Sequence, residues 1–527
     1  MGKRFDPAGS HSANLQYATR EETDARGWSI AAAFAAAACA LHLLFVGRYG
    51  YFRDELYFAV CGSHLAWGYV DVAPLITWIA HCVRTLFGNS LVSLRFLPAL
   101  SSGAKILLTA WIVRGFGGGR YAQLLAATLM FFCPIYLIMD GYLSMNSFEP
   151  LFWMGAVAMA MRIMSGGSPR LWLLFGALSG FGILNKYSML LFGLALVLGL
   201  LVTTGFRYFR NPWIWLGALI ALVIFLPNLL WQVSNHFPTI EQLSNSRITK
   251  NAYVPWYAFI AEQAVLMLPL AVPVVLAGLW FLLADEEGRR YRFLGWTFVF
   301  LLLEMLVLHG QIYYMAPVYP MLFASGAVWI EGKITASGRS WVKAAIVVPL
   351  AAAGIISLPL EIPILPVDTL AAYAAFWDVN KVHVENFPLG KLPQQFADQF
   401  GWEGQAATVA SVYQALPAAD RSRCAILTGN YGEAAAVDYF GARFGLPQAL
   451  SGHNEYYLWG PRGYSGDVVI AVGLQLGVLR SLFNDVQQAA TIENVNAMPA
   501  ENNLPVYLCR MPRTPLVQAW PRLRNFY

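Results

Sequence analysis

The sequence predicts a mainly α-helical, polytopic membrane protein that ends in a small α/β domain. Of its 527 residues, 57% are hydrophobic and only 12% are charged, and the mean hydropathy is +0.51. Soluble domains carry about 25% charged residues. Uncharged runs near or above the roughly 20 residues of a membrane-spanning helix recur along the chain, such as Trp28–Gly47, Tyr121–Met139, Tyr187–Phe206, Asn211–Ile240 and Gln263–Ala284.

We expect about eleven transmembrane helices within residues 28–360. The first is expected to be retained, because residues 1–27 are polar and no small-residue cleavage site precedes Arg48. The expected spans lie near residues 28–47, 91–113, 121–139, 148–161, 171–185, 187–206, 211–231, 263–284, 293–308, 315–330 and 344–360.

The positions of Lys and Arg predict the orientation of these spans. If residues 1–27 form a cytoplasmic segment, most of the Lys and Arg residues that lie outside the spans, up to the last span, are on the cytoplasmic side. The outer loops up to the last span then hold only Arg48, Arg53, Arg84, Lys186, Arg247 and Lys250. This positive-inside bias, with an odd number of spans, predicts a C-terminal region outside the cytoplasm.

Residues 361–527 differ in character from the rest of the chain. A link containing Pro359, Pro363 and Pro366 leads into short β-type runs that alternate with helical runs. The β-type runs are Ala425–Thr428, Asp467–Val472 and Val506–Leu508, and the helical runs are Ala407–Leu416 and Ala434–Phe444. This alternation predicts a small extracytoplasmic α/β domain.

Charge and cysteine content exclude some classes of protein. A net charge of +5 is small for this length and gives no reason to expect a nucleic-acid partner. The six cysteines are scattered, without the spacing of a CxxC site. In an oxidising compartment, Cys61 could pair with Cys82 and Cys424 with Cys509, and the sequence leaves both pairings open.

The first outer loop, residues 48–90, carries the most informative motif. Tyr51–Tyr57 sets Arg53, Asp54 and Glu55 side by side at the membrane edge, where charge is costly unless it is solvated or functional. The structural interpretation is an interfacial helix whose start is capped by Asp54. The functional interpretation is a catalytic carboxylate.

This loop and several later segments resemble the GT-C superfamily of bacterial integral-membrane glycosyltransferases, related to protein O-mannosyltransferases and to the lipid A aminoarabinose transferase. In the first loop the resemblance is carried by Arg53–Phe58 with His64–Asp71 and Pro74. It continues through Met139–Pro150, Gly182–Ser188, His236–Glu241, Tyr313–Pro320, Gly429–Glu433, Leu450–Asn454 and Trp459–Pro461.

The resemblance implies a GT-C-like fold in the bacterial cytoplasmic (inner) membrane, and a hexosyl or pentosyl transfer from a polyprenyl-phosphate sugar donor. The acceptor would be a lipid, a glycan or a protein on the outer face, and transfer would invert the anomeric carbon. The family's pattern makes Asp54 the general base, with Glu55 as a supporting or substrate-binding acid at the catalytic centre. Membrane lipids are the remaining expected partners.

The resemblance also indicates donor-binding residues. Lys186, alone between two apolar spans, is the foremost candidate for the donor phosphate, against a structural interpretation as a snorkelling lysine. Further candidates for the donor or its phosphate are Arg53, Arg84, His236, Tyr313 and Tyr314, whereas Arg95, Asn146, Glu149 and Glu241 are weaker ones.

Two departures from the family's pattern bear on the site. Relatives often have a Lys shortly before the Tyr pair, where this chain reads His309–Tyr313 without a cation, and Ala73 stands in place of the first Pro of a Pro-Pro-Leu run. The first departure increases the weight on Lys186.

No cofactor is expected. Asp54, Glu55, His64, Asp71 and His236 could gather around a divalent metal if loops converge, but their spacing matches no known ligand pattern, so no metal is expected to be required. Lys105 and Glu304 lie within expected spans and are interpreted as structural, either paired with each other or with Lys105 snorkelling.

Two other classes of function compete with an enzyme. A transporter or flippase of lipid-linked sugars would have a similar number of spans but would more often show inverted repeats, which we do not find. A noncatalytic glycan-binding or sensor protein would have no need for the Arg53–Glu55 motif together with Lys186.

Overall fold

The computed structural model describes residues 27–204, 206–250, 253–379, 386, 388 and 390–527. The expected cytoplasmic segment 1–27 lies outside these residues, apart from Gly27. The predicted orientation, which rests partly on Lys and Arg of that segment, therefore stays a prediction.

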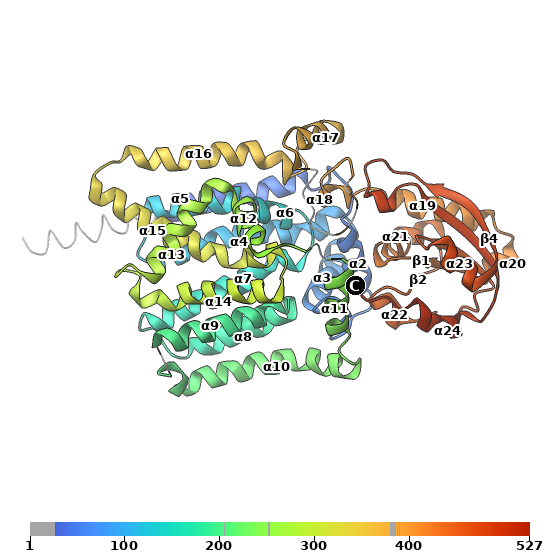
Figure 1. Cartoon of the computed structure of the whole chain (residues 1–527), viewed down its shortest axis with the longest axis horizontal. Coiled ribbons are helices and arrows are strands. Elements are labelled where there is room, and N and C mark those ends of the chain that lie inside the picture. The colour runs from blue at the N-terminus through green and yellow to red at the C-terminus, as the bar shows by residue number, and fades with distance from the viewer. Residues whose placement is uncertain (1–26, 205, 251–252, 380–385, 387, 389) are drawn as a thin grey trace, which may run out of the picture.

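The molecule is elongated, with a bundle of long helices at one end and a mixed α/β domain at the other (Figure 1). The bundle helices run roughly along the long axis. Between the two ends lies a layer of shorter helices, among them α2 (Arg53–Cys61), α3 (Leu75–Phe87) and α11 (Pro238–Thr249). The predicted fold class, a mainly α polytopic membrane protein with a small C-terminal sheet domain, is confirmed.

The bundle begins with a helix over Gly27–Phe45. Its other helices are α4 (Leu91–Gly115), α5 (Arg120–Phe132), α6 (Pro134–Met139), α7 (Met145–Met164), α8 (Leu171–Asn185), α9 (Ser188–Thr204), α10 (Pro212–Ser234), α12 (Trp256–Met267), α13 (Val272–Leu283), α14 (Arg292–Leu308), α15 (Tyr319–Ser337) and α16 (Trp341–Ser357).

Among the described residues, five helices are long and apolar enough to cross a membrane: Gly27–Phe45, Leu91–Gly115, Pro212–Ser234, Arg289–Leu308 and Trp341–Leu360. The pair Trp256–Met267 and Pro269–Leu283 makes a sixth if it is counted as one span, although it bends by 97°. Several other expected spans coincide with shorter apolar helices, such as α8 and α9. The count of eleven therefore stays a prediction.

The expected span over residues 263–284 is not one continuous helix. Leu268 adopts φ 79°, and Pro269 follows it, so the helical hydrogen bonding stops there and the chain turns sharply into α13.

The outer surface of the bundle is apolar, as lipid contact requires. On α10, Trp215, Leu219, Val223 and Leu226 are 62%, 53%, 58% and 41% exposed, and only 11% of this span is buried inside the protein. Large apolar side chains exposed along a whole helix are unfavourable in water and favourable in hydrocarbon. This face of α10 is therefore a lipid-facing surface.

Helices α8 and α10 pack backbone against backbone. A Cβ added at Gly176 would lie 2.0 Å from the carbonyl oxygen of Gly217, and one added at Gly217 would lie 2.2 Å from that of Trp172. Small residues at a helix crossing allow this close approach. It anchors α8, which ends beside Lys186.

The C-terminal part contains a five-stranded sheet in the order β2-β1-β3-β5-β4. β1 (Cys424–Thr428) pairs in parallel with β2 (Ala449–Ser451) and β3 (Val468–Val472), whereas β5 (Leu504–Pro512) is antiparallel to β3 and to β4 (Phe483–Ile492). The helices of this part are α19 (Trp402–Ala415), α20 (Ala418–Arg421), α21 (Tyr431–Gly441), α22 (Glu455–Trp459), α23 (Leu476–Leu482) and α24 (Leu516–Ala519), and α17 (Val367–Phe376) and α18 (Gln394–Ala397) precede them.

All six cysteines are free thiols. Cys61 is buried and Cys82 is exposed, so the two side chains face different surroundings. β3 lies between the strands of Cys424 and Cys509, which separates them by two strand spacings, about 10 Å, whereas a disulfide needs Cα atoms within about 7 Å. Neither open pairing occurs in this structure.

The suggested pair of Lys105 and Glu304 is wrong. Lys105 Nζ lies 2.5 Å from Asp140 Oδ1, and both side chains are almost fully buried. Burial of an unpaired ammonium is costly, so the lysine takes the carboxylate that α6 presents to α4.

Candidate active site

Asp54 lies in the first turn of α2, where the membrane helices meet the C-terminal domain. Its Oδ1 accepts a 2.8 Å hydrogen bond from the hydroxyl of Tyr431, and Arg53 Nε lies 3.6 Å from the same oxygen. The Asp54 side chain is 34% exposed. It is therefore an accessible carboxylate whose orientation is set by a residue from the other end of the chain.

Local sequence explains why Tyr431 is held there. Asn430 caps α21 by accepting a 2.9 Å hydrogen bond from the amide of Glu433, and Glu433 Oε2 accepts bonds from the amides of Gly429 and Asn430 at 2.8 and 3.1 Å. This reciprocal capping box fixes the first turn of α21. Tyr431 is the first residue of that turn.

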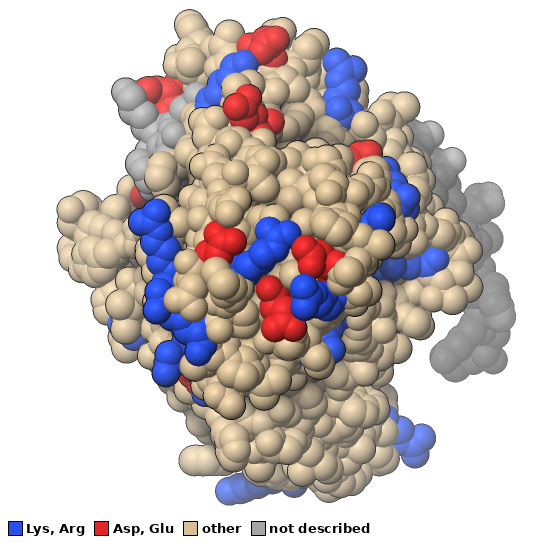
Figure 2. Space-filling view, turned by 90° about the vertical axis from the view of Figure 1, so that its right-hand side faces the viewer, with Lys and Arg blue, Asp and Glu red and all other residues tan. Residues whose placement is uncertain are grey.

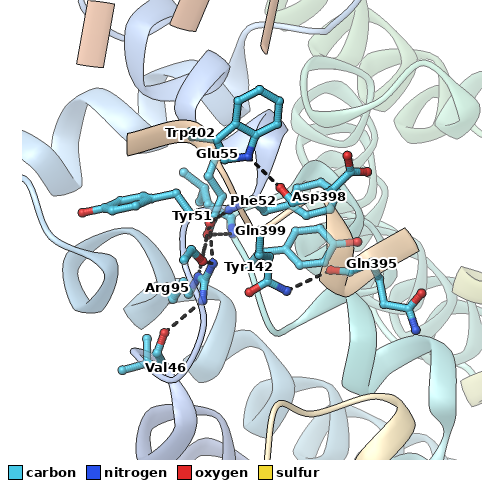
Figure 3. Close-up of polar contacts among 12 residues, drawn as sticks. Val46, Tyr51, Phe52, Glu55, Arg95, Tyr142, Gln395, Asp398, Gln399 and Trp402 are labelled. Carbon is cyan, nitrogen blue, oxygen red and sulfur yellow. Dashed lines mark hydrogen bonds and ion pairs between the residues drawn. The ribbon is translucent and has the colours of Figure 1, made fainter. Parts of the chain in front are cut away.

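Glu55 is fully buried and fully engaged (Figure 3). Arg95 Nε donates to its Oε1 at 2.9 Å, and Arg95 Nη2 donates to its Oε2 at 2.7 Å. The amides of Phe52 and Leu143 donate to the same carboxylate at 2.9 and 2.8 Å. Glu55 thus joins α2, α4 and the segment before α7, and this geometry fits a positioning role.

Arg95 and Arg53 also make contacts around α2. Arg95 donates to the carbonyl oxygens of Val46 and Gly50 at 2.9 and 2.8 Å, so its guanidinium is occupied on several sides. Arg53 Nη1 lies 3.8 Å from Asp398 Oδ1, and its guanidinium carbon is 5.5 Å from the centre of the Tyr431 ring.

Arg84, a residue of α3, lies near the C-terminal end of α2. It donates to Ser63 Oγ at 2.9 Å, to Asn89 Oδ1 at 2.7 Å and to the carbonyl oxygen of Ala59. Its guanidinium carbon is 5.6 Å from the centre of the Tyr439 ring in the C-terminal domain. Within the described residues, no hydrogen bond joins Arg84 to the Lys186 cluster, so its role at the donor phosphate stays a prediction.

A second acid, Asp71, neighbours Asp54. Asp71 Oδ1 accepts from the Tyr57 hydroxyl at 2.8 Å, and Oδ2 accepts from Asn454 Nδ2 at 2.9 Å. Burial raises the pKa of Asp71 to about 6, opposed by the Tyr57 hydrogen bond and reinforced by the charge of Asp54. Asn454, like Tyr431, reaches the first outer loop from the C-terminal domain.

Lys186 lies in the break between α8 and α9, where its backbone is extended (φ −160°, ψ 135°). Its Nζ donates to Asn146 Oδ1 at 2.7 Å and to Glu149 Oε2 at 3.0 Å, and it lies 4.4 and 5.1 Å from the ring centres of Tyr314 and Tyr313. Its side chain is 12% exposed. The structure therefore brings together five residues from three segments of the sequence.

One short segment joins the Lys186 cluster to the Asp54 region. The amide of Leu143 contacts Glu55, the neighbour of Asp54, while Asn146 contacts Lys186. Three residues span at most about 10 Å of extended chain. The two regions are therefore adjacent along this segment.

A second link runs through α10. Asn228 Nδ2 donates to the carbonyl oxygen of Trp67 at 2.8 Å, and its Oδ1 accepts from the Tyr187 hydroxyl at 3.1 Å. Tyr187 follows Lys186 directly, and Trp67 belongs to the first outer loop. The loop and the lysine are thus fixed relative to each other.

His236 and Glu241 lie further from this centre. His236 is exposed between α10 and α11, and Glu241 on α11 forms an ion pair with Arg524. Within the described residues, neither side chain forms a hydrogen bond or an ion pair with Asp54 or Lys186. Arg247 Nη2, on α11, lies 2.9 Å from Nδ1 of His309, which precedes the Tyr pair. A cation from α11 is therefore near the segment His309–Tyr313, which has no Lys or Arg of its own.

Within the part of the chain that the structure describes, no three His, Cys, Asp or Glu residues are arranged to hold a metal ion. His64 stacks on Trp459 with ring centres 4.4 Å apart, and its Nδ1 contacts the carbonyl oxygen of Val60. The expectation that no metal is required stays a prediction.

Sequence reasoning identified Asp54, Lys186 and both tyrosines, and it noted Asn146 and Glu149 more weakly. It missed Tyr431 and Asn454, although both lie in segments that carried the family resemblance. For Tyr431, its position shortly after the β-type run Ala425–Thr428 was the available signal, because the carboxyl ends of parallel strands gather at one edge of a sheet. Asn454 follows β2, which the sequence did not indicate.

Comparison with known proteins found one family match and several solved structures of similar fold. Residues 71–231 match the family described as dolichyl-phosphate-mannose-protein mannosyltransferase. No protein of curated function matches the sequence.

Among solved structures, ArnT from Cupriavidus metallidurans bound to undecaprenyl phosphate is similar, with a TM-score of 0.60 and 16% identity, over 90% of this chain and 97% of that one. The apo state of the same protein gives 0.59 and 16%, over 92% and 98%. The Archaeoglobus fulgidus oligosaccharyltransferase tethered with an acceptor peptide gives 0.50 and 11%, over 79% of this chain and 63% of that one.

Proposed function

With the GT-C superfamily resemblance confirmed at the level of the fold, we propose that this protein is a membrane glycosyltransferase. It moves a sugar from a polyprenyl-phosphate donor to an acceptor on the outer face of the bacterial cytoplasmic membrane. Asp54 acts as the general base, Lys186 binds the donor phosphate, the anomeric carbon is inverted and no metal is required.

The observation that carries this proposal is the environment of Asp54. It is an accessible carboxylate at the junction of the two parts of the molecule, and Tyr431 and Arg53 contact one of its oxygens. Within the described residues, the remaining oxygen, Oδ2, accepts no hydrogen bond. A carboxylate with a free oxygen can accept the proton of an acceptor hydroxyl as that hydroxyl attacks.

The leaving group needs positive charge and hydrogen-bond donors. An ammonium has three N–H donors, and those of Lys186 supply bonds to Asn146 and Glu149. The third donor is available for a phosphate oxygen. Because Asn146 and Glu149 hold the Lys186 ammonium in place, it is preorganised for the charge that develops on the phosphate.

The arrangement suits a single displacement. In such a reaction the base and the leaving group act on opposite faces of the sugar. Asp54 and Lys186 belong to different elements, yet the segment from Leu143 to Asn146 joins their surroundings. A sugar held between them would therefore be approached by the acceptor from one side and leave the phosphate on the other.

The similar structures support the lipid-linked donor. The ArnT structure, which shares this fold, contains undecaprenyl phosphate, and the oligosaccharyltransferase structure contains a tethered acceptor peptide. Sequence identities of 16% and 11% carry the fold to this chain but not the sugar or the acceptor.

Reconstituted protein tests the proposal against the flippase alternative. Purified protein in proteoliposomes would receive a polyprenyl-phosphate sugar labelled in the sugar, together with bacterial membrane extract as the acceptor source. We expect label to leave the polyprenyl fraction with the wild type and with Asp368→Asn, a control at an exposed aspartate. Asp54→Asn should not release it. Movement of labelled donor across the bilayer without release would support the flippase instead.

A further inference from the structure

A pocket opens in the C-terminal domain beside the proposed catalytic centre. Its empty volume is about 580 Å³, including space open to solvent. Its walls come from the ends of β1 and β2, the start of α23 and the last residues of the chain, with Gly429, Gly452, Leu474, Arg522, Arg524 and Asn525 among them.

The pocket lies at the topological switch point of the sheet. From β1 the chain passes to β2 on one side, and then crosses to β3 on the other side of β1. Crossovers in opposite directions leave a crevice at the carboxyl ends of the strands, where open α/β sheets bind ligands. Gly429 directly follows β1, and Gly452 directly follows β2.

The lining is basic. It includes Arg522 and Arg524 and no Asp or Glu. Arg524 forms an ion pair with Glu241 of α11, whereas the exposed Arg522 has no hydrogen bond or ion pair within the described part of the chain.

The outer end of the domain differs from this pocket. There, acidic and basic residues lie side by side (Figure 2). Within the same domain, Asp420 pairs with Arg423 at 3.0 Å and with Arg510 at 2.9 Å. At the outer end, opposite charges neutralise each other. The basic lining of the pocket instead favours an anionic ligand.

The pocket shares its edge with the residues that contact the acids. Tyr431, which contacts Asp54, comes two positions after Gly429, and Asn454, which contacts Asp71, comes two positions after Gly452. A ligand in the pocket would therefore lie beside the two segments that orient the acids of the first outer loop.

From this geometry we propose that the pocket binds a phosphate or carboxylate substituent of the saccharide acceptor, with the Arg522 guanidinium as its charged ligand. This inference rests on the proposed function, because it assigns the acceptor to the Asp54 side of the reaction. It makes Arg522 a specificity-determining residue that selects anionic acceptors.

Binding of a simple probe tests the pocket without requiring turnover. Full-length protein in nanodiscs would be titrated with glucose 6-phosphate, glucuronate, inorganic phosphate and neutral glucose, with binding followed by calorimetry. We expect glucose 6-phosphate or glucuronate to bind more tightly than glucose. Arg522→Gln should weaken that binding about 10- to 100-fold, the loss expected for a hydrogen bond to a charged group, and Arg522→Lys should weaken it less.

Arg480→Gln is the matched control, because Arg480 is an exposed arginine on α23 outside the pocket lining. Equal affinity of Arg522→Gln and Arg480→Gln would overturn the inference, and so would equal binding of charged and neutral sugars or no binding by the wild type. Tight binding of inorganic phosphate alone would also overturn the assignment to a saccharide.

The readout separates this inference from the proposed function. Asp54→Asn should bind the probe like the wild type even though it does not transfer sugar. If Asp54→Asn retains transfer, the proposed base fails while the pocket stands. If Arg522→Gln binds the probe normally while Asp54→Asn abolishes transfer, only the pocket inference fails.

Discussion

Replacing Glu55 by Gln tests whether this residue positions the site or takes part in the chemistry. The Glu55 carboxylate is 0% exposed, and it accepts bonds from Arg95 and from the amides of Phe52 and Leu143. Gln keeps the shape but removes the charge, which leaves the Arg95 guanidinium, 3% exposed, without its counter-ion. Breaking a buried ion pair on one side costs about 3–5 kcal/mol, so we expect destabilisation of that size.

The assay is the free energy of unfolding of the purified protein in detergent micelles, from reversible denaturant titration followed by tryptophan fluorescence. Asp54→Asn is the control at the adjacent, partly exposed position, and it should change stability by no more than about 1 kcal/mol.

Two results would refute this reasoning. Wild-type stability of Glu55→Gln would show that the buried pair does not hold α2 in place. A fully folded Glu55→Gln protein without any transfer would show that Glu55 acts in the reaction itself, whereas a positioning role predicts residual transfer by the folded fraction.

Three further expectations follow from the contacts of the site. Tyr431→Phe removes one hydrogen bond to Asp54 and should lower kcat about 3- to 10-fold, which corresponds to a loss of about 0.5–1.5 kcal/mol. The control is Tyr413→Phe, at an exposed hydroxyl of the same domain, which should leave kcat unchanged. Lys186→Met should lower kcat about 100- to 1,000-fold, as loss of a preorganised donor does, and weaken binding of polyprenyl phosphate in a direct titration; normal kcat would remove Lys186 from the donor site. The pKa of Asp71 is raised from 3.8 to about 6 in the folded protein. Between these pH values the folded state binds more protons than the unfolded state, so the stability of the protein should fall as pH rises. The thermal unfolding temperature of Asp71→Asn should fall less steeply with pH than that of the wild type, and an equal slope would contradict the assignment.

The fold class could be predicted because it depends on composition and on long apolar runs. Errors in the predicted ends of the helices do not change either of these. The sheet was predicted in part: β1, β3 and β5 contain the expected β-type runs. β2, Ala449–Ser451, is too short to show a period, and β4, Phe483–Ile492, is rich in polar residues because it is an edge strand with exposed positions.

Partners inside the bundle could not be predicted. Lys105 pairs with Asp140, which the sequence analysis included only within the motif Met139–Pro150 and gave no role of its own. Hydropathy shows that a charge lies in a span but not which charge faces it, because that depends on helix rotation and packing. The sharp bend at Leu268 was missed for a similar reason, since a positive φ is invisible in an apolar run.

The sequence indicated candidate site residues one by one but not the contacts among them, and their roles stay predictions. Asp54 and Lys186 were identified through motifs, and the structure added the contacts that orient them. Tyr431 lies 377 positions from Asp54, and Lys186 lies 37 from Glu149. Contacts of such separation arise from the tertiary fold, so a single sequence indicates the residue types and leaves their partners open.

The rate of sugar transfer by Asp54→Asn, measured together with donor affinity, tests the central claim most directly. We expect kcat to fall about 100- to 10,000-fold, the contribution of a general base. The affinity for the polyprenyl-phosphate donor should be unchanged, because Lys186 and its neighbours hold the phosphate. Transfer at the wild-type rate by folded Asp54→Asn would contradict the claim that this carboxylate takes the acceptor's proton.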